Sequence, residues 1–307
     1  MTRSHIESEP GFPLRRTMRC MGGVTPPSAL ADGLPGWVTL LRAPNPGPMT
    51  LDGTNTWVLR APGAEAAVVV DPGPADEKHL ARIAGYGPVA FILVTHGHQD
   101  HVEGAAMLSG LVGDAPVLAA DPAHGVGAGP LDRDGRLSGG GLAIRVLDTP
   151  GHTADSVCFE VERDGERVIL SGDTILGRGT AVVAWPDGDL GAYLASLATL
   201  CAYPRVPVLP GHGPALPDCA AIARTYLEHR HARLEQVRAA VAAGAGTPEA
   251  VVAAVYADVD PAIRFAAEWS VRAQLDYLAH TDDPLDHHYP DPRNRESGSG
   301  ADGLEAL

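Results

Sequence analysis

The stretch VTHGHQDHVEG, residues 94–104, ends a continuous apolar run in three histidines and an aspartate within six positions. The run itself, AFILVT at 90–95, has the composition of a strand that is covered on both faces of a sheet. Imidazole and carboxylate groups are costly to desolvate at such a place unless something pairs with them. The stretch therefore predicts a metal site at the carboxyl edge of a sheet.

The spacing of these side chains suits two metal ions. In extended backbone, side chains two positions apart point to the same side, so His96 and His98 can share one ion. Asp100 and His101 come at the turn into a predicted helix and can face a second ion. Imidazole and carboxylate are ligands of Zn²⁺, at roughly 2.0–2.2 Å. We therefore expect two zinc ions, although iron or manganese also suits such ligands.

Three further potential ligands occur in the same kind of place. His152, Asp173 and His212 each follow a predicted strand and have a glycine directly before them, which permits close backbone approach. Asp71 ends another predicted strand and is expected to hold a ligand or its loop in place. A lone histidine after Pro-Gly is usually an ordinary loop residue, but the ordered series predicts one composite site.

Short apolar segments fill the middle of the chain. The nine candidate strands are 37–43, 54–60, 65–71, 89–95, 116–120, 142–148, 156–162, 167–173 and 206–210. Helical patterns fall between some of them, as at 189–200, where Asp189 stands at the N-cap position. Strands in series with occasional helices predict an α+β fold, with two sheets enclosed between helices.

Composition divides the chain into four parts. The predicted strands lie in a β-rich domain, 34–217. Residues 218–281 are Ala-rich with a helical period, and Thr247-Pro248 is a good helix start, so a small helical appendage is expected there. The leader 1–33 and the tail 282–307 have the Pro, Gly and polar content of disordered segments.

The charge and the cysteines bear on partners and compartment. A formal net charge of −15 disfavours non-specific binding to nucleic acid, so we expect neither duplex DNA nor an anionic membrane as a partner. The sequence contains no apolar run of bilayer length and no export signal. Four scattered cysteines lack Cys-x-x-Cys spacing: Cys20, Cys158, Cys201 and Cys219. These features predict a cytoplasmic protein with reduced thiols.

The motifs together carry a family resemblance. HGHQDH, TPGHTADS, SGDTILG and LPGHG, preceded by VVVDPG, resemble the five motifs of the metallo-β-lactamase-fold hydrolases, the superfamily that includes glyoxalase II. The resemblance covers about residues 36–215 and implies a four-layer αβ/βα sandwich with a dinuclear site at one edge. It implies one zinc held by His96, His98 and His152, a second held by Asp100, His101 and His212, and Asp173 bridging both.

The resemblance also implies a mechanism. Two such ions lower the pKa of a bridging water, which makes hydroxide available at neutral pH, and they stabilise the oxyanion that develops after attack. Asp100 is expected to orient this nucleophile or accept its proton, so Asp100 and Asp173 are the candidate catalytic residues. Ser171 and Cys158 lie near the motifs and are expected to be packing residues.

Several branches of the superfamily fit poorly. The zinc β-lactamases carry cysteine where this chain has Asp173, so β-lactam hydrolysis is not expected as the main activity. The interval from Asp173 to His212 leaves no room for the inserted domain of the RNA-processing β-CASP enzymes. The run at 176–183 lacks the Gly-Cys-Gly that glyoxalase II usually shows, so glutathione thioesters are not favoured.

The branch of beta-lactamase-like protein 2 fits better. Gly-x-Gly-Thr at 177–180, GTNTW at 53–57 and the helices after residue 217 resemble this branch, which has a helical, winged-helix-like appendage. The resemblance implies either a single-strand-specific endoribonuclease or a thioesterase acting on carrier-bound chains.

Three functions are therefore compared. Hydrolysis of the phosphodiester bond in single-stranded RNA is the first hypothesis, and a thioesterase acting on acyl-CoA, carrier-protein or glutathione thioesters is the alternative. A non-catalytic metal-binding sensor is the third, disfavoured by the intact ligand set. Four arginines of the appendage could form a mildly basic face for RNA, or an ordinary solvated face: Arg224, Arg230, Arg233 and Arg238. The sequence does not indicate an oligomeric state.

Overall fold

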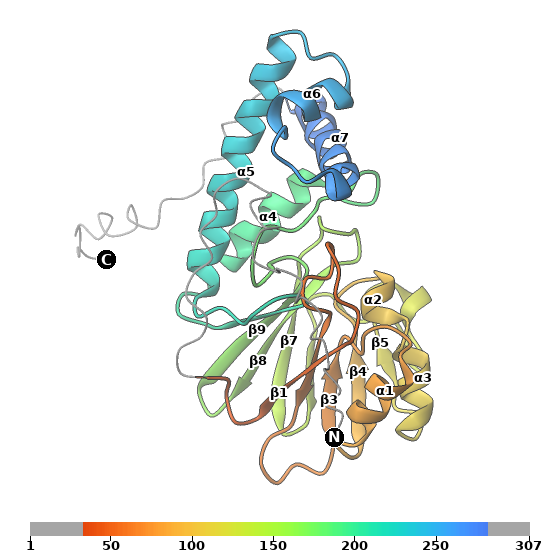
Figure 1. Cartoon of the computed structure of the whole chain (residues 1–307). Coiled ribbons are helices and arrows are strands. Elements are labelled where there is room, and N and C mark those ends of the chain that lie inside the picture. Colours follow the sequence, from red (N-terminus) through yellow and green to blue (C-terminus); the bar gives the residue numbers. More distant parts are fainter. Residues whose placement is uncertain (1–32, 282–307) are drawn as a thin grey trace, which may run out of the picture.

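A computed structural model describes residues 33–281 as two facing five-stranded sheets with helices outside them (Figure 1). The first sheet has the order β1-β2-β3-β4-β5. Its strands are β1 (Val38–Arg42), β2 (Asn55–Leu59), β3 (Ala67–Val70), β4 (Val89–Leu93) and β5 (Val117–Leu118). Strands β1 to β3 pair antiparallel, whereas β3, β4 and β5 are parallel. The predictions of a disordered leader before Gly33 and a disordered tail after Thr281 lie outside the described residues.

The second sheet has the order β10-β9-β8-β7-β6. Its strands are β6 (Arg136–Gly139), β7 (Leu142–Asp148), β8 (Val157–Arg163), β9 (Glu166–Gly172) and β10 (Val208–Pro210). Only the β9–β10 pairing in this sheet is parallel. The nine predicted strands are present, but β6 was not predicted, because its sequence RLSG has a single large apolar residue and forms a half-exposed edge.

Side-chain alternation along the strands produces the four layers. On β3, Val68 and Val70 face the core between the sheets, while Val69 packs toward helices on the outside. Strand β9 does the same, with Leu170 in the inter-sheet core and Ile169 on the outer side. Each of these strands is buried on both faces, which explains its continuous apolar sequence. The predicted α+β four-layer architecture is confirmed.

The outer layers are helical. Against the first sheet lie α1 (Glu77–Ala84), α2 (Gln99–Val102) and α3 (Ala105–Leu111); against the second lie α4 (Leu190–Leu200) and the start of α5 (Cys219–Ala242). Two short 3₁₀ turns are also present, η1 (Pro122–His124) and η2 (Pro261–Ile263). The side chain of Asp189 accepts a hydrogen bond from the Ala192 amide at 2.6 Å, so the predicted N-cap of α4 is confirmed.

The C-terminal helices extend beyond the sandwich. Helices α6 (Pro248–Val255) and α7 (Arg264–His280) pack on the second half of α5 around a small apolar cluster that includes Val237, Val252 and Val271. The first half of α5 belongs instead to the core that covers the second sheet, through Ile222 and Tyr226. Helix α5 therefore packs in both parts, and the domain boundary near residue 217 stays a prediction. Within residues 33–281, no helix has the length and apolarity needed to cross a bilayer.

Candidate metal centre

Seven side chains converge where strands of both sheets end. Two groups have the composition and spacing to hold metal ions, the ligand atoms of each lying within 4.8 Å of one another. One group consists of His96, His98, His152 and Asp173, and the other of Asp100, His101 and His212. The structure thus brings together all seven residues that the sequence predicted as ligands.

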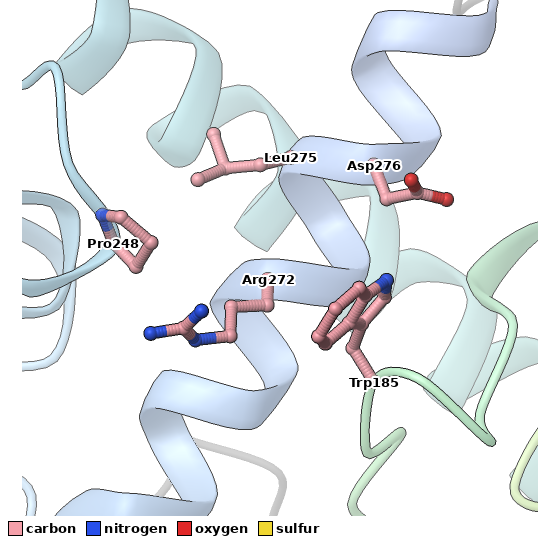
Figure 2. Close-up of a pocket in the computed structure, with 5 residues that line it drawn as sticks. All are labelled: Trp185, Pro248, Arg272, Leu275 and Asp276. Carbon is pink, nitrogen blue, oxygen red and sulfur yellow. The ribbon is translucent and has the colours of Figure 1, made fainter.

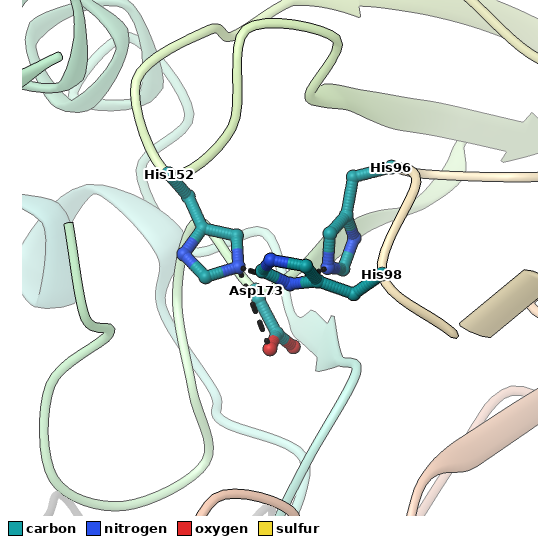
Figure 3. A group of neighbouring side chains, drawn as sticks. All are labelled: His96, His98, His152 and Asp173. Atoms are coloured by element: carbon teal, nitrogen blue, oxygen red, sulfur yellow. Dashed lines mark hydrogen bonds and ion pairs between the residues drawn. The ribbon is translucent and has the colours of Figure 1, made fainter. Parts of the chain in front are cut away.

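The first group is drawn together from three segments, as Figure 3 shows. Nδ1 of His98 lies 3.0 Å from Nε2 of His96 and 3.1 Å from Nε2 of His152. Nε2 of His152 lies 3.8 Å from Oδ2 of Asp173. His96 and His152 are buried and His98 is exposed, so one side of this group is open to solvent.

The second group is the more enclosed one. Nε2 of His212 lies 3.2 Å from Nε2 of His101 and 3.2 Å from Oδ2 of Asp100. Asp173 faces both groups, because its Oδ2 lies 3.8 Å from Nε2 of His152 in the first group and 3.3 Å from Nε2 of His212 in the second. This placement suits a carboxylate that contacts two ions at once.

The charges of the centre fit a cation. Burial lowers the pKa of His152 to about 4, which keeps this imidazole neutral. Burial also disfavours charge on His212, but Asp173 and Asp100 outweigh it and raise the pKa of His212 to about 10. Burial would raise the pKa of Asp173, yet His212 and His101 hold it well below its usual range. The two carboxylates thus stay ionised and require positive charge beside them, which metal ions supply in place of protons.

Unpaired buried atoms point the same way. Oδ1 of Asp173 and Nδ1 of His212 are buried and have no hydrogen-bond partner among the described residues. Buried polar atoms are rarely left in that state unless an ion or water pairs with them. The ligand types and the orphaned carboxylate oxygen therefore fit a divalent transition metal such as zinc.

Asp71 lies behind the centre. Its Oδ1 accepts a hydrogen bond from the Thr95 amide at 2.8 Å, and its Oδ2 accepts one from the Thr95 hydroxyl at 2.8 Å. The same Oδ2 lies 2.9 Å from Nδ1 of His101. A carboxylate on Nδ1 fixes the imidazole tautomer and leaves Nε2 of His101 facing the other ligands.

His152 is oriented by a backbone group instead. Its Nδ1 lies 2.7 Å from the carbonyl oxygen of Val182, in the loop between β9 and α4. The Tyr226 hydroxyl of α5 donates to the carbonyl of Gly179 in this loop, at 2.7 Å. Helix α5 therefore holds the loop that sets the direction of a candidate ligand.

Sequence reasoning missed the role of the GTNTW stretch, which it used only to assign a branch. The Thr54 hydroxyl donates to Oδ2 of Asp100 at 2.9 Å, and Nδ2 of Asn45 donates to the same hydroxyl at 3.0 Å. Nδ2 of Asn55 donates to the carbonyls of Pro210 and Gly213, at 3.0 and 2.8 Å, on both sides of His212. Buried polar residues in an otherwise apolar strand were the available signal.

Glycine before His212 is required by packing. A Cβ atom at Gly211 would lie 2.5 Å from Oδ1 of Asp173 and 2.7 Å from Cε1 of His101. The glycine that the sequence places before His212 thus lets the backbone pass against two other candidate ligands.

The candidate nucleophiles outside the centre are inert. Burial raises the pKa of the Cys158 thiol to about 11. The Ser171 hydroxyl is buried and donates to the carbonyl of Ile175 at 2.8 Å. Neither has an adjacent base, which is consistent with the packing roles expected from the sequence.

Two of the four arginines that sequence analysis considered for a basic face are turned into the fold. Arg230 is buried, donates to the carbonyl of Ala181 and stacks over the ring of Tyr193. Arg233 donates to the carbonyl of Val255 at 2.7 Å. Arg238 pairs with Glu235, and Arg224 also has an interaction partner. The guanidinium groups of Arg230 and Arg233 thus serve packing within the fold.

Comparisons with known proteins agree with this architecture. Residues 49–212 match the family model of the metallo-beta-lactamase superfamily. The beta-lactamase-like protein 2 homolog of Caenorhabditis elegans is 32% identical over 267 residues, which cover 83% of this chain and 87% of that protein. A protein of Emericella nidulans named thioesterase pkgB is 29% identical over 216 residues, which cover 69% of this chain and 61% of that protein.

A solved structure extends the likeness to the whole described fold. The crystal structure of a beta-lactamase domain protein from Burkholderia ambifaria superposes with a TM-score of 0.69 and 25% identity, covering 81% of this chain and 90% of that one. The resemblance to the beta-lactamase-like protein 2 branch is confirmed by the named relatives. By its fold, its converging histidines and aspartates, and the match over 49–212, this chain belongs to the metallo-beta-lactamase superfamily of metal-dependent hydrolases.

Proposed function

We propose that the chain is a thioesterase, a metal-dependent hydrolase that cleaves the thioester of an acyl group carried by coenzyme A or by a carrier protein. The observation that carries the proposal is the surface beside the centre. The helical segment turns Arg230 and Arg233 into its own packing, so these two guanidinium groups are not offered to a phosphate backbone. A polyanionic RNA strand needs such neutralising charges along its whole length, whereas the thioester bond and its acyl group are uncharged.

The relatives support the same choice. One protein that resembles this chain is named a thioesterase, and several fungal relatives are named lactamase-like proteins. Asp173 distinguishes the centre from that of the zinc β-lactamases, which carry cysteine at the equivalent position. A thioester releases a thiolate, which can leave without first being protonated. The centre therefore needs no separate general acid for the leaving group.

The proposed centre holds two ions, one on each group of ligands, with zinc as the expected metal. Bound there, the ions would bring the pKa of a water near neutrality and polarise the thioester carbonyl. Asp100 is positioned to accept a hydrogen bond from the attacking water, since its Oδ2 is fixed by Thr54 and its side chain reaches the solvent. Asp173 would hold the two groups of ligands at a constant separation.

The overall reaction consumes one water and yields a carboxylic acid and a free thiol. Asp100 is held as a carboxylate, because His101 and His212 outweigh burial and keep its pKa well below its usual range. A carboxylate of this kind can orient the water without being protonated first. The burial of His96, His101 and His212 keeps the imidazoles fixed while substrates exchange on the side of His98.

The test compares the two substrate classes on one preparation. Zinc-loaded protein is offered acyl-CoA thioesters and a labelled single-stranded RNA, with Asp173→Asn as the variant. Thioester turnover should fall at least about a hundredfold in this variant. Loss of a residue that only hydrogen-bonds to a metal ligand already lowers metal affinity or activity about 10–100-fold. The matched control is Asp164→Asn, in the exposed hairpin turn between β8 and β9, which should retain full turnover.

The outcomes separate the hypotheses. RNA cleavage that depends on Asp173, without thioester turnover, would replace the proposal by the endoribonuclease. Full metal binding with neither reaction would favour the sensor. We also propose a cytoplasmic location, which agrees with the buried free thiols of Cys158 and Cys219, and leave the oligomeric state open.

A further inference from the structure

A pocket of about 330 Å³ lies between the sandwich and the C-terminal helices (Figure 2). It is lined by Trp185, Pro248, Arg272, Leu275 and Asp276. Trp185 comes from the loop between β9 and α4, and the other residues come from α6 and α7. The pocket is shallow and largely open to solvent, with a volume at the lower end of the roughly 300–1,000 Å³ typical of small-molecule sites.

The pocket and the candidate metal centre share one loop. Trp185 is three residues after Val182, whose carbonyl oxygen lies 2.7 Å from Nδ1 of His152. Three residues of extended chain span at most roughly 11 Å, so the backbone of Trp185 lies within that distance of Val182. Hydrogen bonds from Tyr226 to Gly179 and from Arg230 to Ala181 fix the same loop. One loop thus carries both a wall residue of the pocket and the carbonyl oxygen that orients His152.

The chemistry of the pocket suits an uncharged, apolar ligand. Trp185 leaves 44% of its surface exposed, and Pro248 and Leu275 supply further apolar wall. The one cation, Arg272, is already paired with Glu268 at 2.7 Å and faces Glu249 at 3.6 Å. Asp276 adds negative charge at the rim, so a phosphate would be repelled rather than bound. An exposed indole beside aliphatic groups is an efficient contact for a hydrocarbon or aromatic ring.

We infer that this pocket binds the apolar end of the substrate's acyl group, with Trp185 as the specificity-determining contact. The inference rests on the proposed thioesterase function for the identity of the ligand. It makes the helical segment part of the substrate site, with the thioester at the metal centre and the acyl end between Trp185 and α7. The enzyme then selects acyl groups that are long or aromatic enough to reach the pocket.

The chain offers a matched control on α7, the helix that lines one side of the pocket. Trp269 of α7 is exposed to 42%, close to the value for Trp185, and stacks edge to face on Phe265 with ring centroids 5.0 Å apart. It does not line the pocket. Replacing either tryptophan by alanine removes the same atoms from a comparably exposed position, but only Trp185→Ala opens the pocket wall.

The first experiment measures acyl selectivity. The ratio of kcat/KM for octanoyl-CoA to that for acetyl-CoA is determined for the wild type, Trp185→Ala and Trp269→Ala, each with its zinc content measured. The ratio should fall about tenfold or more in Trp185→Ala, since several methylene contacts are lost, and stay at the wild-type value in Trp269→Ala. An unchanged ratio in Trp185→Ala, or an equal fall in both variants, overturns the inference.

The second experiment measures binding without turnover, which separates this inference from the proposed function. Calorimetric titration uses octanoyl-amino-CoA, in which nitrogen replaces the thioester sulfur and prevents hydrolysis. Binding that weakens about tenfold only in Trp185→Ala supports the pocket even if no thioester is hydrolysed by the wild type. Equal binding by wild type and Trp185→Ala, or no binding by the wild type at millimolar concentration, overturns the pocket even if thioesters are hydrolysed.

Discussion

The edge of the two sheets and the segment α5–α7 use charged side chains in opposite ways. At the edge, five imidazoles and two carboxylates converge, and a buried oxygen of Asp173 is left without a hydrogen-bond partner among the described residues. In the helices, Arg230 and Arg233 find carbonyl acceptors and aromatic rings within the fold. Charge that the chain leaves unsatisfied indicates a binding site, whereas charge satisfied internally indicates packing. Residue type alone does not distinguish the two.

The largest effect is expected from a substitution at the edge of the sheets that changes no charged side chain. In Gly211→Ala, thioester turnover should fall at least about a hundredfold, because the added Cβ would overlap Asp173 and His101. Zinc content per chain should fall as well. Gly246→Ala is the control, since nothing lies within 4 Å of a Cβ there. A fully active, zinc-replete Gly211→Ala protein would contradict the described packing.

A smaller effect is expected from the hydroxyl behind Asp100. Thr54→Val keeps the shape but removes the donor to Oδ2 of Asp100, so kcat should fall about 10–100-fold with a smaller change in KM. Thr54→Ser should restore most of the rate. Thr199→Val, at an exposed position of α4, tests whether loss of any threonine hydroxyl has the same effect. Equal losses in Thr54→Val and Thr54→Ser would show that packing matters and not the hydrogen bond.

Arg230 tests whether the arginines of the helices serve packing within the fold. Arg230→Met leaves the carbonyl of Ala181 without its donor, and the free energy of unfolding should fall by about 1–3 kcal/mol in urea titrations. Arg238→Met, which removes an exposed pair with Glu235, should change it by less than about 0.5 kcal/mol. If the two variants were equally stable and both lost affinity for single-stranded RNA, the helices would present a nucleic-acid surface after all.

The smallest effect concerns protonation in α5. Burial, together with Arg230 and Arg233, lowers the pKa of His229 to about 4. The unfolded chain, with a pKa near 6.5, therefore takes up this proton first, so the stability contribution of neutral His229 is complete above that pH and declines as the pH falls toward 4. His229→Gln should show a shallower loss of stability between pH 6.5 and 4 than the wild type, by thermal unfolding. Parallel curves for both proteins would refute it.

The sequence was sufficient for the fold and the ligand candidates because both follow local patterns. A ligand directly after a buried strand, with glycine before it, is visible in a short window, as at His152 and His212. The contacts that orient the candidate ligands are not local: Thr54 and Asp100 are 46 positions apart, and Asn55 reaches Gly213 across 158 positions. No periodicity reports such pairs.

The helical segment shows a different limit. Helical period predicted α5, and the same period places Arg230 between Leu227 and Leu234 on the buried stripe, which is the local signal for its burial. The pocket at Trp185 could not be predicted, because it depends on how a loop and two later helices approach one another. Prediction from sequence was thus best within single elements and weakest where elements meet.

The clamp that Asn55 places on both sides of His212 has a consequence for biosynthesis. The side-chain amide of Asn55 in β2 has its hydrogen-bond acceptors only once residues 210–213 have been synthesised. His212, the last candidate ligand along the chain, is synthesised at the same stage, after most of the sandwich. Contacts of such long sequence separation form slowly. A nascent chain therefore exposes an incomplete set of histidines for most of its synthesis, and metal binding at the proposed centre would be one of the last steps in its maturation.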